Sequence, residues 1–185
     1  MVSPGKIIMK KINLNINKRT NMITTLALFS ALSITLSILE SIIPTANILP
    51  PGAKLGLSNI ITMFICGTFG LLPALIIATV KSFFVLSLRG PTAFLMSFFG
   101  GICSICMIWV LTKKPKKQLS FIFISIVGAI SHNLVQLLVS SFLIGKSIFF
   151  YIPVLILAAV FTGSITGTLL KVISPALSKV PYSLN

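Results

Sequence analysis

The stretch F-I-F-I-S-I-V-G-A-I-S-H-N-L-V-Q-L-L-V-S-S-F-L-I, residues Phe121–Ile144, contains no charged side chain. A helix of this length reaches about 36 Å, which exceeds the roughly 30 Å hydrocarbon core of a bilayer. The stretch therefore predicts a membrane-spanning helix. The whole chain has the same character, because 56% of its residues are hydrophobic, 9% are charged and its mean hydropathy is +1.09. Such a composition is typical of a protein embedded in lipid.

Apolar stretches of this kind recur along the chain and predict an all-α integral membrane protein, a bundle of six transmembrane helices. Five spans is the alternative, because the second stretch is short and adjoins the third through Gly70 and Pro73. We expect a basic cytoplasmic N-terminal segment over residues 1–21, a membrane domain over 22–174 and a short cytoplasmic tail over 175–185. The predicted spans are approximately Met22–Ile43, Leu57–Phe69, Leu71–Leu88, Thr92–Leu111, Phe121–Ile144 and Ser147–Ile173.

The positions of the basic residues predict the orientation of these spans. Lys and Arg number 15 against a single acidic residue, for a net charge of +14. Six spans with both termini in the cytoplasm place most of this charge inside, as the positive-inside rule requires. The predicted outer connections hold only Lys54, Arg89 and Lys146. The predicted inner segments hold Lys6, Lys10, Lys11, Lys18, Arg19, Lys113, Lys114, Lys116, Lys117, Lys171 and Lys179.

The scarcity of acidic residues excludes most catalytic chemistry. Glu40 is the only acidic side chain, and the chain has no Asp. Paired carboxylates for acid–base catalysis and the oxygen-rich sites that hold Mg²⁺ both need more than one acid. The C-x-x-C at Cys103 and Cys106 has no second pair to complete a zinc site, so we interpret it as packing. We expect no enzymatic activity, no metal ion and no cofactor, and the basic segments lack the features of a nucleic-acid module.

Polar residues inside the predicted spans mark a candidate binding site, because polar groups are costly in the bilayer and are usually functional. Lys81 lies near the middle of the third span. One carboxylate cannot pair with both Lys81 and Arg89, which leaves a ligand anion or water in a cavity as the remaining partner. We expect Lys54, Lys81 and Arg89 to converge on an outward-facing pocket that the Pro44–Gly56 segment closes, and Glu40 to order Lys54 or that segment.

The fifth predicted span carries a polar face at helical spacing. His132, Gln136 and Ser140 are spaced i, i+4 and i+8, and Asn133 falls beside them. Four polar groups on one side of a membrane helix favour a binding face over incidental core polarity. We expect His132, Asn133 and Gln136, together with Asn59, to orient a ligand by hydrogen bonds.

Four sequence strings resemble a known integral-membrane family, heptaprenyl diphosphate synthase component I, which is also called Gx transporter. The most specific is P-G-A-K-L-G-L-S-N-I at Pro51–Ile60. The others are E-S-I-I-P at Glu40–Pro44, S-F-F-G-G-I-C-S at Ser97–Ser104 and S-H-N-L-V-Q-L at Ser131–Leu137. The family tends to have Arg where this chain has Lys81, a change that keeps the charge but loses the bidentate geometry.

The resemblance implies two different functions. The family name implies a subunit of a polyprenyl diphosphate synthase, with a prenyl transferase as partner. The family architecture resembles the S component of energy-coupling factor (ECF) vitamin transporters. There, an A-x-x-x-A on the first helix docks against a shared transmembrane subunit that works with ATPases; Ala27 and Ala31 match this spacing, with simple packing as the alternative. The resemblance also implies a bacterial cytoplasmic membrane and a flavin or isoprenoid diphosphate as ligand.

Taken together, these patterns lead us to expect an ECF S-component-like subunit that binds a small anionic ligand. The first alternative is a non-catalytic membrane subunit that assists heptaprenyl diphosphate synthesis for quinones. The second alternative is an autonomous proton-coupled transporter, for which Glu40 and His132 are the available titratable relays. The chain has no nucleotide-binding motif, so energy from ATP would have to come from other subunits.

Overall fold

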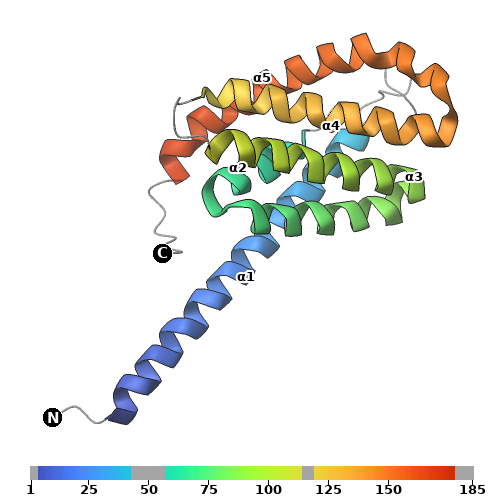
Figure 1. Cartoon of the computed structure of the whole chain (residues 1–185). Coiled ribbons are helices and arrows are strands. Elements are labelled where there is room, and N and C mark those ends of the chain that lie inside the picture. Colours follow the sequence, from blue (N-terminus) through green and yellow to red (C-terminus); the bar gives the residue numbers. More distant parts are fainter. Residues whose placement is uncertain (1–3, 43–56, 114–118, 178–185) are drawn as a thin grey trace.

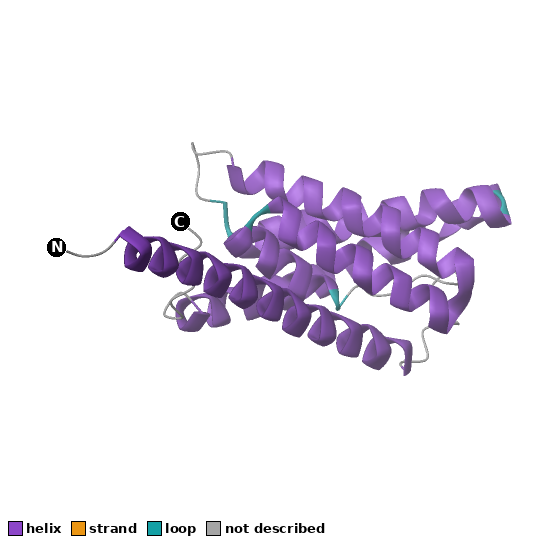
Figure 2. Cartoon of the chain, turned by 90° about the horizontal axis from the view of Figure 1, so that it is seen from below, coloured by secondary structure: helices purple, strands orange, loops and turns teal. Residues whose placement is uncertain are grey.

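The structure, a computed structural model, describes residues 4–42, 57–113 and 119–177, and every regular element in these ranges is a helix (Figures 1 and 2). All-helical architecture was predicted and is confirmed for these ranges. The elements are α1 (Pro4–Ile42), α2 (Asn59–Phe69), α3 (Leu71–Lys113), α4 (Phe121–Ile144), the 3-10 turn η1 (Lys146–Tyr151) and α5 (Ile152–Leu177).

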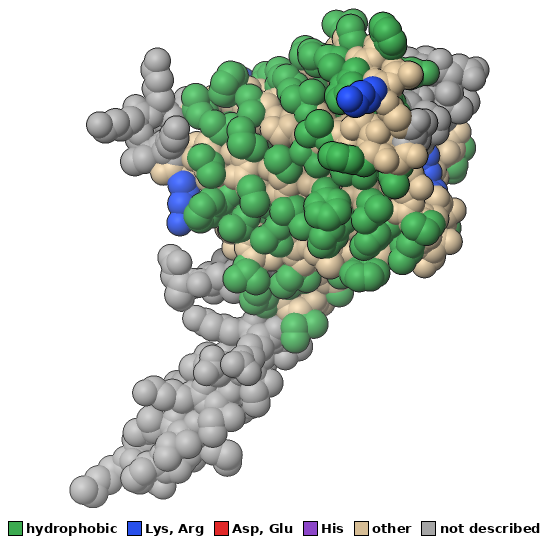
Figure 3. Space-filling view, turned by 45° about the vertical axis from the view of Figure 1, so that its right-hand side comes forward, with side chains coloured by type: hydrophobic (Ala, Val, Ile, Leu, Met, Phe, Trp, Pro, Cys, Tyr) green, Lys and Arg blue, Asp and Glu red, His purple; other side chains and the backbone are tan. Residues whose placement is uncertain are grey.

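The lengths and surfaces of the helices show a multi-pass membrane protein. Four helical segments are long and apolar enough to cross a bilayer: Met22–Ile42, Leu71–Lys113, Phe121–Leu143 and Lys146–Val172. Large apolar side chains face outward on all of them, and the face in Figure 3 is covered by hydrophobic groups with few Lys or Arg between them. In contrast, α2 has 11 residues and reaches only about 16 Å, too short to cross the bilayer alone.

Helix α3 is not one straight rod, because it folds back on itself at Gly90. Gly90 has φ 81° and ψ −177°, a conformation that only glycine adopts readily. Pro91 follows it and suits the first position of the next helical limb, where no amide hydrogen is needed. Figure 1 shows the two limbs, residues 71–89 and 91–113, running side by side. They coincide with the predicted spans Leu71–Leu88 and Thr92–Leu111.

Contacts between the limbs fix this arrangement. The Ser82 hydroxyl donates to the Ser97 hydroxyl at 3.2 Å. The rings of Phe83 and Phe94 lie 5.3 Å apart, centre to centre. In a straight helix, the 15 residues between Ser82 and Ser97 would separate them by about 22 Å.

Close backbone contact joins α4 to α5 at two glycines. A Cβ on Gly163 would lie 2.7 Å from Cα of Ile126, and a Cβ on Gly167 would lie 2.5 Å from Cα of Ile122. Small residues at such positions let membrane helices approach closely enough for dispersion forces to hold them. These contacts explain the G-x-x-x-G of this helix as close packing within the bundle.

Helix α1 lies at the edge of the bundle. Among the described elements it contacts only α2 and α3, and Figure 2 shows it running along one side of the other helices. Its inner face carries the buried Ser30, Ser33, Ser37 and Glu40. Ser41, the next residue along, is exposed, because its position on the helix turns it away from the bundle.

We predict that cysteines placed at Ser82 and Ser97 form a disulfide, because the two hydroxyl oxygens are 3.2 Å apart. The test uses a variant in which Cys66, Cys103 and Cys106 are replaced by Ala, with mild oxidation in membranes and mass spectrometry of the peptides. The matched control pairs Ser97→Cys with Ser87→Cys, because Ser87 is exposed and about 7.5 Å further along the helix. A straight α3 would leave both pairs reduced.

Candidate functional site

A polar cluster inside the bundle is built around Lys81, which is 2% exposed. Its Nζ donates to Asn59 Oδ1 at 3.0 Å and to Ser58 Oγ at 3.3 Å. Ser33 on α1 donates from its hydroxyl to the Ser58 carbonyl at 3.4 Å. Three helices therefore meet at one polar cluster, with α3 supplying the ammonium, α2 its first residues and α1 a serine. We call Ser58, Asn59 and Lys81 the Lys81 cluster.

The shortness of α2 determines what Lys81 meets. Lys81 lies ten residues, or about 15 Å, from the start of α3, and α2 begins beside it, so the N-terminus of α2 stands deep in the bundle. The first-turn amides of a helix lack intrahelical partners and carry a partial positive charge. Ser58 is the N-cap residue, but its side chain makes no cap bond and instead accepts from Lys81. The combined field of ammonium and helix N-terminus favours an anion here.

Of the other two predicted basic residues, one lies away from this cluster and one lies outside the described residues. Arg89 is exposed at the bend of α3, about 12 Å of helix rise from Lys81. Lys54 lies outside the described residues, as does the Pro44–Gly56 segment predicted to close the pocket. Glu40 is 2% exposed on the inner face of α1, and its predicted role in ordering Lys54 stays a prediction.

His132 and Gln136 form a second buried cluster on α4, each 3% exposed. His132 Nε2 and Gln136 Nε2 are 2.9 Å apart. Within the described part of the chain, His132 Nδ1 and Gln136 Oε1 have no hydrogen-bond partner. Gly100 permits this placement, because a Cβ there would lie 3.0 Å from His132 Nδ1. Lys81 is close enough to His132 to interact with it electrostatically.

Asn133 and Ser140 bind neighbouring helices rather than this pair. Asn133 Nδ2 donates to the Leu155 carbonyl of α5 at 3.0 Å. Ser140 Oγ donates to Met96 Sδ of α3 at 3.4 Å. The predicted polar face of α4 therefore contacts two partners, since α4 lies between α3 and α5. The bond made by Asn133 joins α4 to α5.

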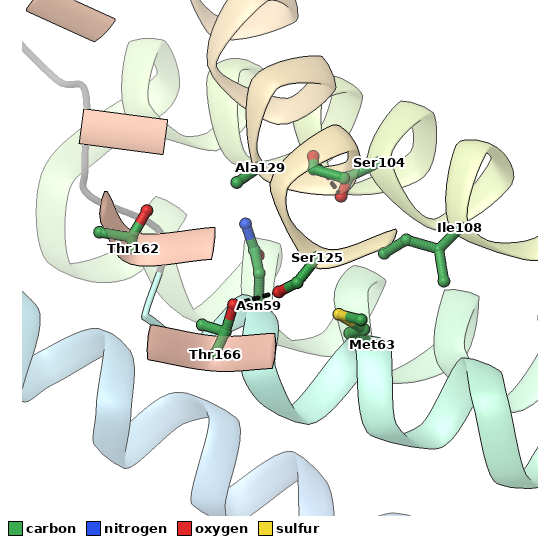
Figure 4. A pocket seen from close by; sticks show the side chains of 9 residues that line it. Asn59, Met63, Ser104, Ile108, Ser125, Ala129, Thr162 and Thr166 are labelled. Atoms are coloured by element: carbon green, nitrogen blue, oxygen red, sulfur yellow. Dashed lines mark hydrogen bonds between the residues drawn. The ribbon is translucent and has the colours of Figure 1, made fainter. Parts of the chain in front are cut away.

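A small pocket lies beside Asn59 (Figure 4). It has room for about one water molecule and is bounded by α2, α3, α4 and α5. Its polar lining, apart from Asn59, was not predicted from the sequence. Ser and Thr are common in membrane helices, where their hydroxyls bond to the backbone of the same helix, so their presence alone does not indicate a pocket. The one sequence signal for this lining is the i, i+4 spacing of Thr162 and Thr166 beside the interface glycines. The lining residues are Asn59, Met63, Ser104, Ile108, Ser125, Gly128, Ala129, Thr162 and Thr166.

Ala27 and Ala31 are both exposed on α1, the helix at the edge of the bundle. They lie one turn apart, with Leu28 at 60% exposure and Leu32 at 43% beside them. In the described part of the chain, packing inside the bundle therefore does not account for this pair. The surface faces either lipid or another protein.

The family model described as heptaprenyl diphosphate synthase component I matches residues 29–173, most of the chain. The chain belongs to this family. The match covers the predicted site residues Glu40, Lys54, Asn59, Lys81, Arg89, His132, Asn133 and Gln136, and it includes Ala31 but not Ala27. No curated protein and no solved structure matches the chain.

Proposed function

We propose that this protein is a non-catalytic membrane subunit that binds a diphosphate-bearing isoprenoid and assists a partner enzyme in heptaprenyl diphosphate synthesis for quinones. The observation that carries the proposal is the Lys81 cluster, where a buried ammonium and the N-terminus of α2 meet inside a membrane bundle. The family description supports the nature of the ligand.

The electrostatics of the cluster favour a ligand with negative charge. The buried ammonium and the first amides of α2 both create positive potential at this point, so both attract a bound anion. Short helices that end inside a membrane protein and point their N-termini at anionic groups are a known solution to this problem. Ser58 and Asn59 would then share Lys81 with the ligand.

The chemistry of synthesis must lie on the partner. Prenyl transfer needs carboxylates to hold Mg²⁺ on the diphosphate, and this chain has one Glu and no Asp. An isoprenoid suits the remaining surface, because its apolar tail can stay in the lipid around the outward-facing side chains, and its head group would enter the bundle to meet the buried Lys81. In this proposal, the membrane protein binds the isoprenoid substrate, and a soluble, Asp-rich transferase catalyses the reaction.

The proposal includes a topology. The folded-back α3 supplies two crossings and α2 a partial one, which supports six helical passes with both termini in the cytoplasm of a bacterium. Residues 1–21 and 175–185 would then flank the membrane domain, 22–174, on the cytoplasmic side. The distribution of Lys and Arg supports this orientation.

A second candidate is the S component of an ECF-type transporter, and the exposure of Ala27 and Ala31 favours it. A flat, small-residue surface on a peripheral helix suits docking against another membrane helix. In this version the same Lys81 cluster would bind a small anionic vitamin-like ligand such as a flavin. A shared transmembrane subunit and its ATPases would supply the energy.

We predict that Lys81→Met weakens the binding of inorganic pyrophosphate at least about tenfold, because it removes the only ammonium of the cluster. The measurement is calorimetric titration of the protein in lipid nanodiscs. Methionine has a similar length and is apolar, so the bundle should stay folded. Lys146→Met, at an exposed lysine of η1, is the matched control and should bind like the wild type. Equal affinity of all three proteins for pyrophosphate would contradict the proposal that Lys81 binds an anion.

We predict that the protein purified in mild detergent from its native membrane brings a prenyl transferase with it. Recovery of a coupling-factor transmembrane subunit with ATPases would instead support the second candidate. In that case Ala27→Trp with Ala31→Trp should abolish the recovery, because the bulky rings prevent close approach of helices. Leu157→Trp on α5, at a position with 71% exposure, is the control and should leave it unchanged.

A further inference from the structure

The hydrogen bonds around the pocket beside Asn59 determine which of its lining atoms can donate a hydrogen bond and which can only accept one. Lys81 has only hydrogens to offer, so the atom of Asn59 that faces it at 3.0 Å must be the oxygen, Oδ1. The amide nitrogen, Nδ2, therefore points the other way. Figure 4 shows it directed into the pocket, between Ala129, Ser125 and Thr162. Asn59 thus belongs both to the Lys81 cluster and to the lining of the pocket, and it contributes an N–H donor to the pocket.

The four hydroxyl groups of the pocket have no donor left for a ligand. Ser104 donates to the Gly128 carbonyl at 2.8 Å, and Thr162 donates to the Ala158 carbonyl at 2.8 Å. Thr166 donates to the Gly163 carbonyl at 2.9 Å.

Ser125 is in hydrogen-bond contact with Thr166, whose own proton is already used, so Ser125 is the donor of that pair. All four hydroxyls therefore present only lone pairs, opposite the single donor group of Asn59.

We infer that this pocket is a binding site for one ordered water molecule, which accepts a hydrogen bond from Asn59 Nδ2 and donates to the hydroxyl oxygens opposite. Water is the ligand class that fits both the size and the polarity. An ammonium ion has no lone pair for Asn59 and would be repelled by Lys81. An anion would meet the lone pairs of four hydroxyl oxygens.

The water has a consequence for Lys81, and this part rests on the proposed function. A hydrogen bond to Nδ2 fixes the plane of the Asn59 amide and so fixes Oδ1 against the ammonium. Without it, Asn59 could rotate and Lys81 would lose the hydrogen bond to Oδ1. Asn59 is therefore a positioning residue that joins the hydrated pocket to the anion site.

The test is a nuclear magnetic resonance measurement of contacts between water and the side-chain amide of Asn59 in ¹⁵N-asparagine-labelled protein in nanodiscs. The signal is assigned by its loss in Asn59→Ala. We expect a cross-peak between this amide and a long-lived water in the wild type. We expect its loss in Ala129→Val, whose added methyl groups fill the pocket without removing a hydrogen bond. Thr168→Val, which removes an exposed hydroxyl elsewhere on α5, should keep it.

The affinity of the same proteins for inorganic pyrophosphate separates this inference from the proposed function. Ala129→Val should bind pyrophosphate about fivefold more weakly than the wild type, the effect of one hydrogen bond. A wild type without the water cross-peak overturns the inference whether or not pyrophosphate binds, as does a cross-peak that survives Ala129→Val. If the cross-peak behaves as expected but the wild type binds no pyrophosphate, the water site stands and the proposed function fails.

Discussion

A lysine ammonium inside a membrane bundle needs polar partners, and the structure around Lys81 is arranged to supply them. The hydration of the charge is lost on burial, and hydrogen bonds to Ser58 and Asn59 replace part of it. Helix α2 begins beside Lys81, so its first residues rather than its side meet the ammonium. A helix that begins inside the membrane leaves backbone groups without intrahelical partners, and the polar cluster that α2 shares with Lys81 offsets part of this cost.

The rest of the bundle holds α2 and α3 in this register. Gly90 and Pro91 fold α3 into two limbs, and Gly163 and Gly167 allow α5 to approach α4 at backbone distance. Helix α4 then binds both neighbours through polar side chains, as Asn133 does with the Leu155 carbonyl. These contacts are short and specific, as expected where apolar burial gives helices no preference for one another over lipid.

Much of the architecture could be predicted because it depends on local sequence. Length and apolarity determine membrane helices, the Gly90–Pro91 pair determines a break, and both follow from single-residue properties. The position of α2 could not be predicted, since the run Leu57–Phe69 reads as a short span and its depth depends on its neighbours. Lys81 and Arg89 look alike in sequence, yet one is buried and the other exposed, because one faces the bundle and the other stands at a bend. Partners such as Ser125 and Thr166 depend on how two helices are rotated against each other.

The most direct test of the account is the position of a bound anion. A crystal of the protein grown with selenate, whose selenium scatters anomalously, would locate it. The account predicts an anomalous peak within hydrogen-bonding distance of Lys81 Nζ, at the N-terminus of α2. Peaks confined to exposed basic side chains such as Lys146, with none at Lys81, would contradict it.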